Sequence, residues 1–147
     1  MYRTTGYVAG DEVEANGIAG IKMILEERGG VHKGAYMVDF DKLQMIYRLF
    51  ARIAKRTIVN IWIVQFVLRK NDRGEVEKSV MDAFLDLLGA NLRSNDVVAL
   101  NGKNQAILIL TDVAEGEENV PIDRITAQWN AIEGHEGYTL TYETDGM

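Results

Sequence analysis

The sequence predicts an α+β fold in which an antiparallel sheet carries helices on one face. Apolar residues recur at three- and four-residue intervals in three segments, which predicts helices over residues 41–55, 75–93 and 121–133. Runs rich in β-branched and aromatic residues, typical of strands, cover residues 58–68, 96–100, 106–111 and 138–144. From the first of these strands onward the order is β-α-β-β-α-β. This is the ferredoxin-like plan, preceded here by one extra helix towards the N-terminus.

The composition is that of a folded domain and excludes several classes of function. The chain has 147 residues, of which 47% are hydrophobic, and this is enough for one core. Its net charge of −6 argues against a nucleic-acid partner, because such binding depends on Lys and Arg displacing counterions. The chain contains no cysteine, which excludes disulfides and thiolate metal sites. No apolar run approaches the roughly 20 residues of a membrane span, and no signal-peptide pattern is present. We therefore expect a cytoplasmic protein that makes no membrane contact.

Residues 1–33 are predicted to be a tail and a helix or linker outside the main domain, which covers residues 34–147. Apolar residues in the segment 11–28 fit an amphipathic helix loosely, and Gly29-Gly30 would end it. Gly17 and Gly20 interrupt the pattern. The segment is either a short helix of the domain or a linker from an upstream module, and the sequence leaves both alternatives open.

The helix over residues 41–55 is expected to begin at a cap formed by Asp39 or Asp41. One apolar stripe of this helix is expected to face a core. The residues of the stripe are Leu43, Ile46, Tyr47, Phe50, Ile53 and Ala54. The run that follows, from Ile58 to Leu68, is too continuous for a strand with one wet face. It therefore predicts a strand in the centre of the sheet.

A hairpin follows the helix over residues 75–93, and its turn is the first candidate site. Asn101-Gly102 between two apolar strands is typical of a hairpin turn, whose residues face solvent while the strands hold them rigidly. Pro121 suits the first residue of the last helix, whose inward residues are Ile122, Ile125, Trp129 and Ile132. The alternating segment 138–144 predicts a half-exposed strand at the edge of the sheet.

The stretch from Leu92 to Leu110 carries a resemblance to a known family. The motif Arg93-Ser94-Asn95-Asp96, a short strand, a polar turn and a second apolar strand follow one another there. This arrangement resembles the centre of the GGDEF domain, the diguanylate cyclase fold of bacterial cyclic-di-GMP signalling. The resemblance covers about residues 34–144, and the family has the same order of helices and strands.

The signature residues depart from the family pattern. The family's Gly-Gly-Asp-Glu-Phe aligns with Gly102-Lys103-Asn104-Gln105-Ala106, so only the first glycine is kept. The family's carboxylates hold a divalent metal against a triphosphate, and the amides of Asn104 and Gln105 lack that charge. The first strand also ends without the family's acidic ligand, at Leu68-Arg69, and the loop that reads guanine is shortened to residues 70–76. The resemblance therefore implies a domain without catalysis, bound metal or cofactor.

One functional pattern of the family is kept. Arg93 and Asp96 match its RxxD motif at the family's spacing from Gly102. In the family these residues bind cyclic-di-GMP, so the resemblance implies a ligand site at Arg93 and Asp96. In the alternative interpretation Arg93 is a solvated cation favoured by the helix dipole, and Asp96 is a cap residue. No second arginine stands just before the turn, where the chain has Leu100-Asn101.

Together these features predict a catalytically inactive GGDEF-like signalling domain that acts through protein–protein contact, with a protein partner or as a homodimer. A receptor for cyclic-di-GMP or another nucleotide is the alternative hypothesis, and an active diguanylate cyclase ranks below both. A ferredoxin-like fold without kinship to the family is a further possibility. A first strand that pairs outside the proposed sheet order would indicate it.

Overall fold

The computed structural model describes residues 11–58 and 60–147 of the chain. The chain divides into two compact units, Met1–His32 and Lys33–Met147. In the first unit, helix α1 spans Asp11–Leu25 and is kinked at Gly17, whose φ of 56° and ψ of −139° are not helical. None of the helices in the described part of the chain is long and apolar enough to cross a membrane. The proposed domain boundary after residue 33 stays a prediction.

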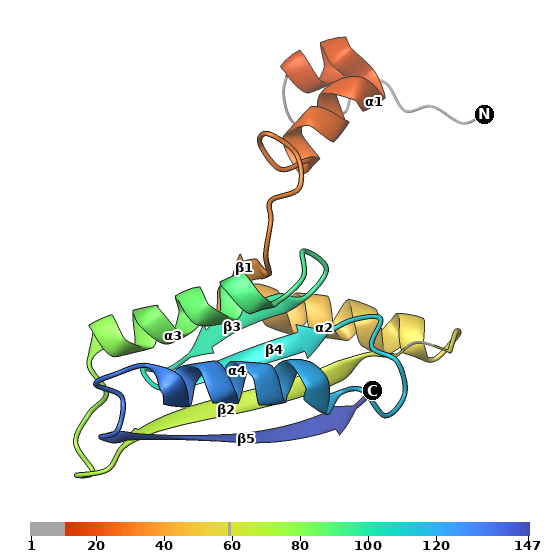
Figure 1. Ribbon diagram of the computed structural model, residues 1–147. Helices are drawn as coiled ribbons and strands as arrows, with labels where there is room; N and C mark the ends of the chain where they lie inside the picture. Colours follow the sequence, from red (N-terminus) through yellow and green to blue (C-terminus); the bar gives the residue numbers. More distant parts are fainter. Residues whose placement is uncertain (1–10, 59) are drawn as a thin grey trace. The chain divides into compact units, whose positions relative to one another are not determined.

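The second unit is a five-stranded mixed sheet with three helices (Figure 1). The strands lie in the order β1-β3-β4-β2-β5. The elements are, in chain order, β1 (Tyr36–Val38), α2 (Phe40–Ala54), β2 (Trp62–Lys70), α3 (Lys78–Asn91), β3 (Val97–Asn101), β4 (Gln105–Leu110), α4 (Asn119–Ala131) and β5 (Tyr138–Gly146).

The α+β fold class is confirmed, and the last four strands have the predicted ferredoxin-like arrangement. Strand β2 pairs antiparallel with both β4 and β5, and β3 pairs antiparallel with β4. This is the sheet order that a β-α-β-β-α-β chain adopts when each helix crosses over one face. Strand β5 lies at the edge of the sheet, as its alternating sequence indicates.

Two details differ from the predicted plan. Strand β1 adds a fifth, parallel strand beside β3, so the sheet is mixed rather than purely antiparallel. Helix α2 does not join α3 and α4 but packs on the other face, where Leu43 lies in a second, smaller core. The helices therefore cover both faces. The amphipathic pattern of α2 shows which of its sides is buried, but it carries no information about which face of the sheet receives that side.

The main core lies between the sheet and the helices α3 and α4. Alternate residues of each strand point into it, since successive side chains of a strand point to opposite faces. Its fully buried members include Val64, Phe66 and Leu68 of β2, Phe84 and Leu88 of α3, Leu108 of β4, and Ile122, Ile125 and Trp129 of α4. Phe84 makes edge-to-face contacts with both Phe66 and Trp129, and these contacts tie the two helices to the central strand.

Three sequence predictions about single residues need correction. Ile58 lies before β2 and is fully exposed, because the strand begins only at Trp62. Pro121 is the third residue of α4 rather than the first. Ile132 is the C-cap residue of α4 and is 38% exposed, because the chain has already left the helical conformation there. The cap at Asp39 is confirmed, since its Oδ1 accepts a hydrogen bond from the Lys42 N–H at 2.8 Å.

Gly34, in the segment before β1, touches the backbone of helix α3. Its φ is +80°, and a Cβ atom at this position would lie 2.5 Å from the carbonyl oxygen of Gly89. Both the backbone conformation and the close approach therefore require glycine. Gly89 itself lies inside α3, and a Cβ atom there would meet nothing within 4 Å.

We predict that Gly34→Ala and Gly89→Ala change stability in opposite directions. Gly34→Ala should lower the free energy of unfolding by about 2 kcal/mol or more, because it adds strain and a clash. Gly89→Ala should be neutral or raise the free energy by up to about 1 kcal/mol, because alanine favours the helix. Urea denaturation measures both. Equal effects of the two substitutions would contradict the contact between Gly34 and α3.

Candidate functional site

Arg93 and Asp96 lie together in the connection from α3 to β3. Asp96 is 2% exposed, and each oxygen of its carboxylate accepts a hydrogen bond. Its Oδ2 accepts the backbone N–H of Arg93 at 3.0 Å, and its Oδ1 accepts the N–H of Thr111 at 3.1 Å. The Nε of Arg93 lies 3.6 Å from the same Oδ2. The carboxylate thus joins the start of β3 to the end of β4.

The guanidinium group of Arg93 also binds protein rather than pointing only to solvent. It donates hydrogen bonds to the backbone carbonyls of Thr111 and Asp112, although the side chain remains 52% exposed. Beside it is a cavity of about 200 Å³ that Asp96 and Arg124 also line. Arg124 in turn donates to the Asn91 carbonyl at 2.7 Å. Two cations and the buried carboxylate of Asp96 therefore meet at this small cavity, which the exposed Asp112 and Glu117 also line.

The turn of the hairpin lies at the opposite end of β3 and β4 from Arg93 and Asp96. Strand β3 has five residues, so roughly 16 Å of strand separates the two candidate positions. In the turn, Gly102 has a φ of +70°, which glycine adopts without strain. The Nζ of Lys103 lies 3.6 Å from the carboxylate of Glu75, across a cavity of about 500 Å³ between the turn and the start of α3.

The side chains of Asn104 and Gln105 are both hydrogen-bonded to the sheet. The Nδ2 of Asn104 donates to the Leu68 carbonyl at 3.0 Å, and the Asn104 carbonyl accepts the Leu68 N–H at 2.9 Å. The Oε1 of Gln105 accepts from the Nε2 of Gln65 at 2.9 Å and from the Nδ2 of Asn101 at 3.1 Å. The amides at the signature positions therefore extend the pairing of β2 with β4.

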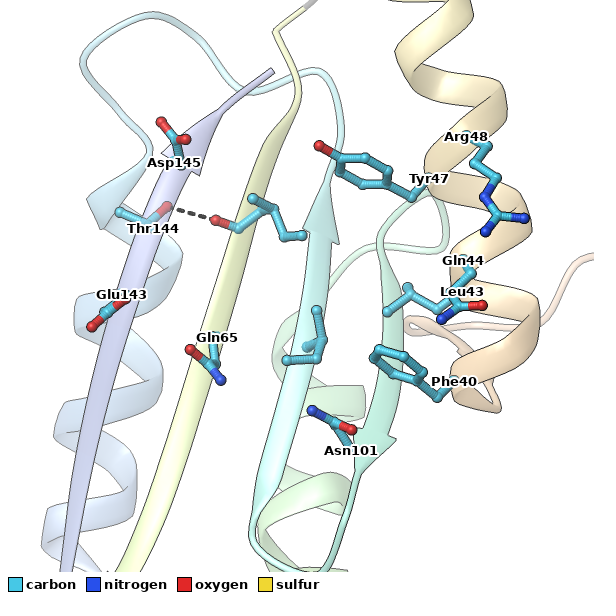
Figure 2. A pocket seen from close by; sticks show the side chains of 12 residues that line it. Phe40, Leu43, Gln44, Tyr47, Arg48, Gln65, Asn101, Glu143, Thr144 and Asp145 are labelled. Atoms are coloured by element: carbon cyan, nitrogen blue, oxygen red, sulfur yellow. Dashed lines mark hydrogen bonds between the residues drawn. The ribbon is translucent and has the colours of Figure 1, made fainter.

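A wide groove opens on the sheet face that carries α2 (Figure 2). Its volume is about 500 Å³, within the range of ligand and peptide sites. We call it the sheet groove, and its lining residues are Phe40, Leu43, Gln44, Tyr47, Arg48, Ile63, Gln65, Asn101, Ile107, Glu143, Thr144 and Asp145. In Figure 2, helix α2 forms one wall and β5 the other, with Gln65 and Asn101 between them.

A third polar cluster joins the ends of β2 and β5 to the start of α3. The Nζ of Lys70 lies 2.6 Å from the Glu77 carboxylate, which also accepts a hydrogen bond from the Tyr138 hydroxyl. These two hydrogen bonds, with that of Lys70 the larger cause, lower the pKa of Glu77 to about 2. The same contact with Glu77 raises the pKa of Lys70 and that of Tyr138.

The structure thus brings Arg93 next to Asp96 and keeps both away from the signature residues Gly102 to Ala106. Sequence reasoning missed the sheet groove, whose walls come from distant parts of the chain. The one signal was Gln65, the single polar residue among the first seven residues of β2. Across residues 11–58 and 60–147, no group of three or more His, Asp or Glu side chains is arranged to hold a metal ion.

Comparison with known proteins gives likenesses of structure but none of sequence. No family model matches the chain. No curated protein matches it significantly. Among solved structures, the crystal structure of a DGC protein from Thermotoga maritima matches 75% of this chain and 81% of its own, with 16% identity and a TM-score of 0.49. At these values the likeness carries no argument about activity, and the fold assignment above rests on the strand order.

We predict that Asp96→Ala destabilises the fold by about 2–4 kcal/mol, because it leaves the partly buried N–H groups of Arg93 and Thr111 without acceptors. The measurement is the free energy of unfolding in urea. Asp86→Ala, at an exposed position on α3, is the matched control and should change stability by no more than about 0.5 kcal/mol. If both variants lose equally little free energy of unfolding, the Asp96 carboxylate does not stabilise the hairpin.

We further predict an acid-sensitive contribution from Glu77. Because its pKa falls from 4.5 to about 2 on folding, the unfolded chain binds more protons between these values, and stability rises with pH across this window. Glu77→Gln should therefore be less stable than wild type above pH 4.5, and this difference should shrink as the pH falls towards 2. Urea titrations at several pH values measure it.

Tyr138→Phe serves as the graded control for Glu77→Gln, since it removes only the weaker of the two hydrogen bonds to the carboxylate. It should retain part of the pH dependence. A stability difference between wild type and Glu77→Gln that stays constant across the window would contradict the assignment.

Proposed function

We propose that this chain is a catalytically inactive GGDEF-like signalling domain that acts by protein contact. The observation that carries the proposal is the chemistry of the hairpin turn at Asn104 and Gln105. Where the family has metal-binding carboxylates, Asn104 and Gln105 have amides, and their hydrogen bonds go to β2 and to neighbouring side chains. An uncharged amide is a poor substitute for a carboxylate beside a divalent ion and a triphosphate.

The surroundings of the turn support the same proposal. The cavity beside the turn is lined by three carboxylates, and each is paired with a lysine: Glu75 with Lys103, Glu77 with Lys70, and Asp82 with Lys78. The end of β2 beside the turn carries Leu68, Arg69 and Lys70 and offers no acidic oxygen. A reaction of two nucleoside triphosphates requires divalent cations to offset the phosphate charge, and those cations require carboxylates that are available as ligands.

We predict no conversion of GTP to cyclic-di-GMP by the wild-type chain with Mg²⁺ or Mn²⁺, measured by chromatography of the products. The triple variant Lys103→Gly/Asn104→Asp/Gln105→Glu restores the family's residues at these three positions. It should also be inactive, because β2 still ends without a carboxylate. A cyclase with an intact signature, assayed in parallel, verifies the conditions. Turnover by wild type would refute catalytic inactivity.

A second candidate function is binding of cyclic-di-GMP at Arg93 and Asp96. The observation in its favour is that Arg93 and Arg124 line one cavity, since paired guanidinium groups suit a phosphodiester. Against it, that cavity measures only about 200 Å³, below the usual range for ligand sites, and Arg93 and Asp96 already bind the backbone.

Calorimetric titration of cyclic-di-GMP separates the two candidate functions. Binding heat with wild type that Arg93→Ala abolishes would favour the receptor. Arg56→Ala, at an exposed position just after α2, is the matched control for loss of a positive charge. Absence of binding heat with wild type would remove the receptor hypothesis.

A further inference from the structure

The two faces of the sheet are unequally covered. Helices α3 and α4 pack side by side on one face, whereas α2 lies alone on the other and contacts β3. Strands lie about 4.8 Å apart and a helix is about 10 Å wide, so a five-stranded sheet has room for two helices on each face. The place of a second helix beside α2, over β2 and β5, is occupied by the sheet groove.

The open half of this face is apolar in the middle and acidic at its edge. Ile63 and Val67 of β2 are half-buried there. On β5, Glu143 and Asp145 stand at alternate positions and therefore point to the same side of the sheet, next to Gln65 and Ile63 in the β2–β5 register. Both carboxylates line the sheet groove.

The outer side of α2 has the complementary character. Met45 and Leu49 are 67% and 56% exposed, and they stand four residues apart, so they form one apolar ridge on the helix. Arg48 and Arg52, also four residues apart and exposed, form a basic ridge beside it. The exposed side of α2 is therefore complementary to the open surface over β2 and β5: apolar residues can meet apolar residues, and arginines can meet carboxylates.

We propose that the sheet groove is occupied by helix α2 of a second copy of this chain. A two-fold axis that runs along the helices lets each chain place its α2 over β2 and β5 of the other, so that both α2 helices run in the same direction in one layer between two sheets. Arg48 and Arg52 of each chain meet Glu143 and Asp145 of the other, which fixes the register of the pair. The inference rests on the proposed function in protein contact and names the partner.

The test is the mass of the full chain in solution, by sedimentation equilibrium. Wild type should sediment at twice the 16.5 kDa of one chain. The variants Arg48→Glu/Arg52→Glu and Glu143→Lys/Asp145→Lys should each raise the dimer dissociation constant by about 100-fold or more, since like charges then face each other at both contacts. Circular dichroism shows whether each variant is folded.

Mixing the two variants gives the decisive measurement. In a mixed dimer, the acidic α2 of one chain faces the lysines of the other, and the remaining contact is wild type, so both contacts are complementary. The mixture should therefore form dimers although neither variant does so alone. Glu115→Lys/Glu133→Lys changes the net charge as much as the β5 variant does, at exposed positions outside the groove, and should leave the dimer intact.

Three outcomes would overturn the proposed dimer. The first is a wild type that is monomeric at about 100 μM, a concentration above the dissociation constant of a stable interface of standard size. The second is that the charge-reversed variants dimerise as wild type does. The third is that the mixture of the two variants stays monomeric. A monomeric wild type that also produces nothing from GTP would remove this dimer and leave the proposed function intact. Formation of cyclic-di-GMP would remove the proposed function whatever the mass of the chain.

Discussion

The arrangement of the hairpin depends on the buried carboxylate of Asp96. Within the described residues it is the one charged side chain that is buried. Its side chain holds the ends of β3 and β4 together, and its backbone carbonyl accepts the N–H of Tyr36 at 2.7 Å, which aligns β1 beside β3. Burial of an ion is unfavourable unless partners surround it. Here two backbone N–H groups donate hydrogen bonds to the carboxylate, and the Arg93 guanidinium adds an ion pair at 3.6 Å. One residue thus aligns three strands.

Most elements of the second unit could be predicted from periodicity. The helical spacing in α4 identified Ile122, Ile125 and Trp129 as inward residues, because a regular amphipathic helix has a single buried stripe. The same argument could not place α2, because a buried stripe does not specify which face of the sheet it meets. Continuous hydrophobicity correctly placed β2 inside the sheet, where it pairs with both β4 and β5, but it did not show that Ile63 and Val67 on the α2 side are only half-buried.

The candidate sites differ in how many of their residue contacts could be predicted from the sequence. Arg93 and Asp96 are three residues apart, so their proximity follows from local geometry, although the engagement of Arg93 with the carbonyls of Thr111 and Asp112 does not. The sheet groove is built from α2, β2 and β5, which meet only after the sheet has formed. Glu143 and Asp145 are unremarkable acidic residues in the sequence. Their position on the open face is a consequence of the β2–β5 register.

The two hydrogen bonds between Asn104 and Leu68 set a constraint on how this chain can evolve. The Asn104 side chain is a donor to the Leu68 carbonyl. An ionised carboxylate at this position would present an acceptor to an acceptor and lose the pairing, at a cost of about 1–3 kcal/mol if the carbonyl stayed buried. Metal chemistry and hairpin stability therefore make opposite demands on residue 104. A mutational path towards metal binding has to begin with a less stable fold, and marginal stability makes such steps costly to the organism.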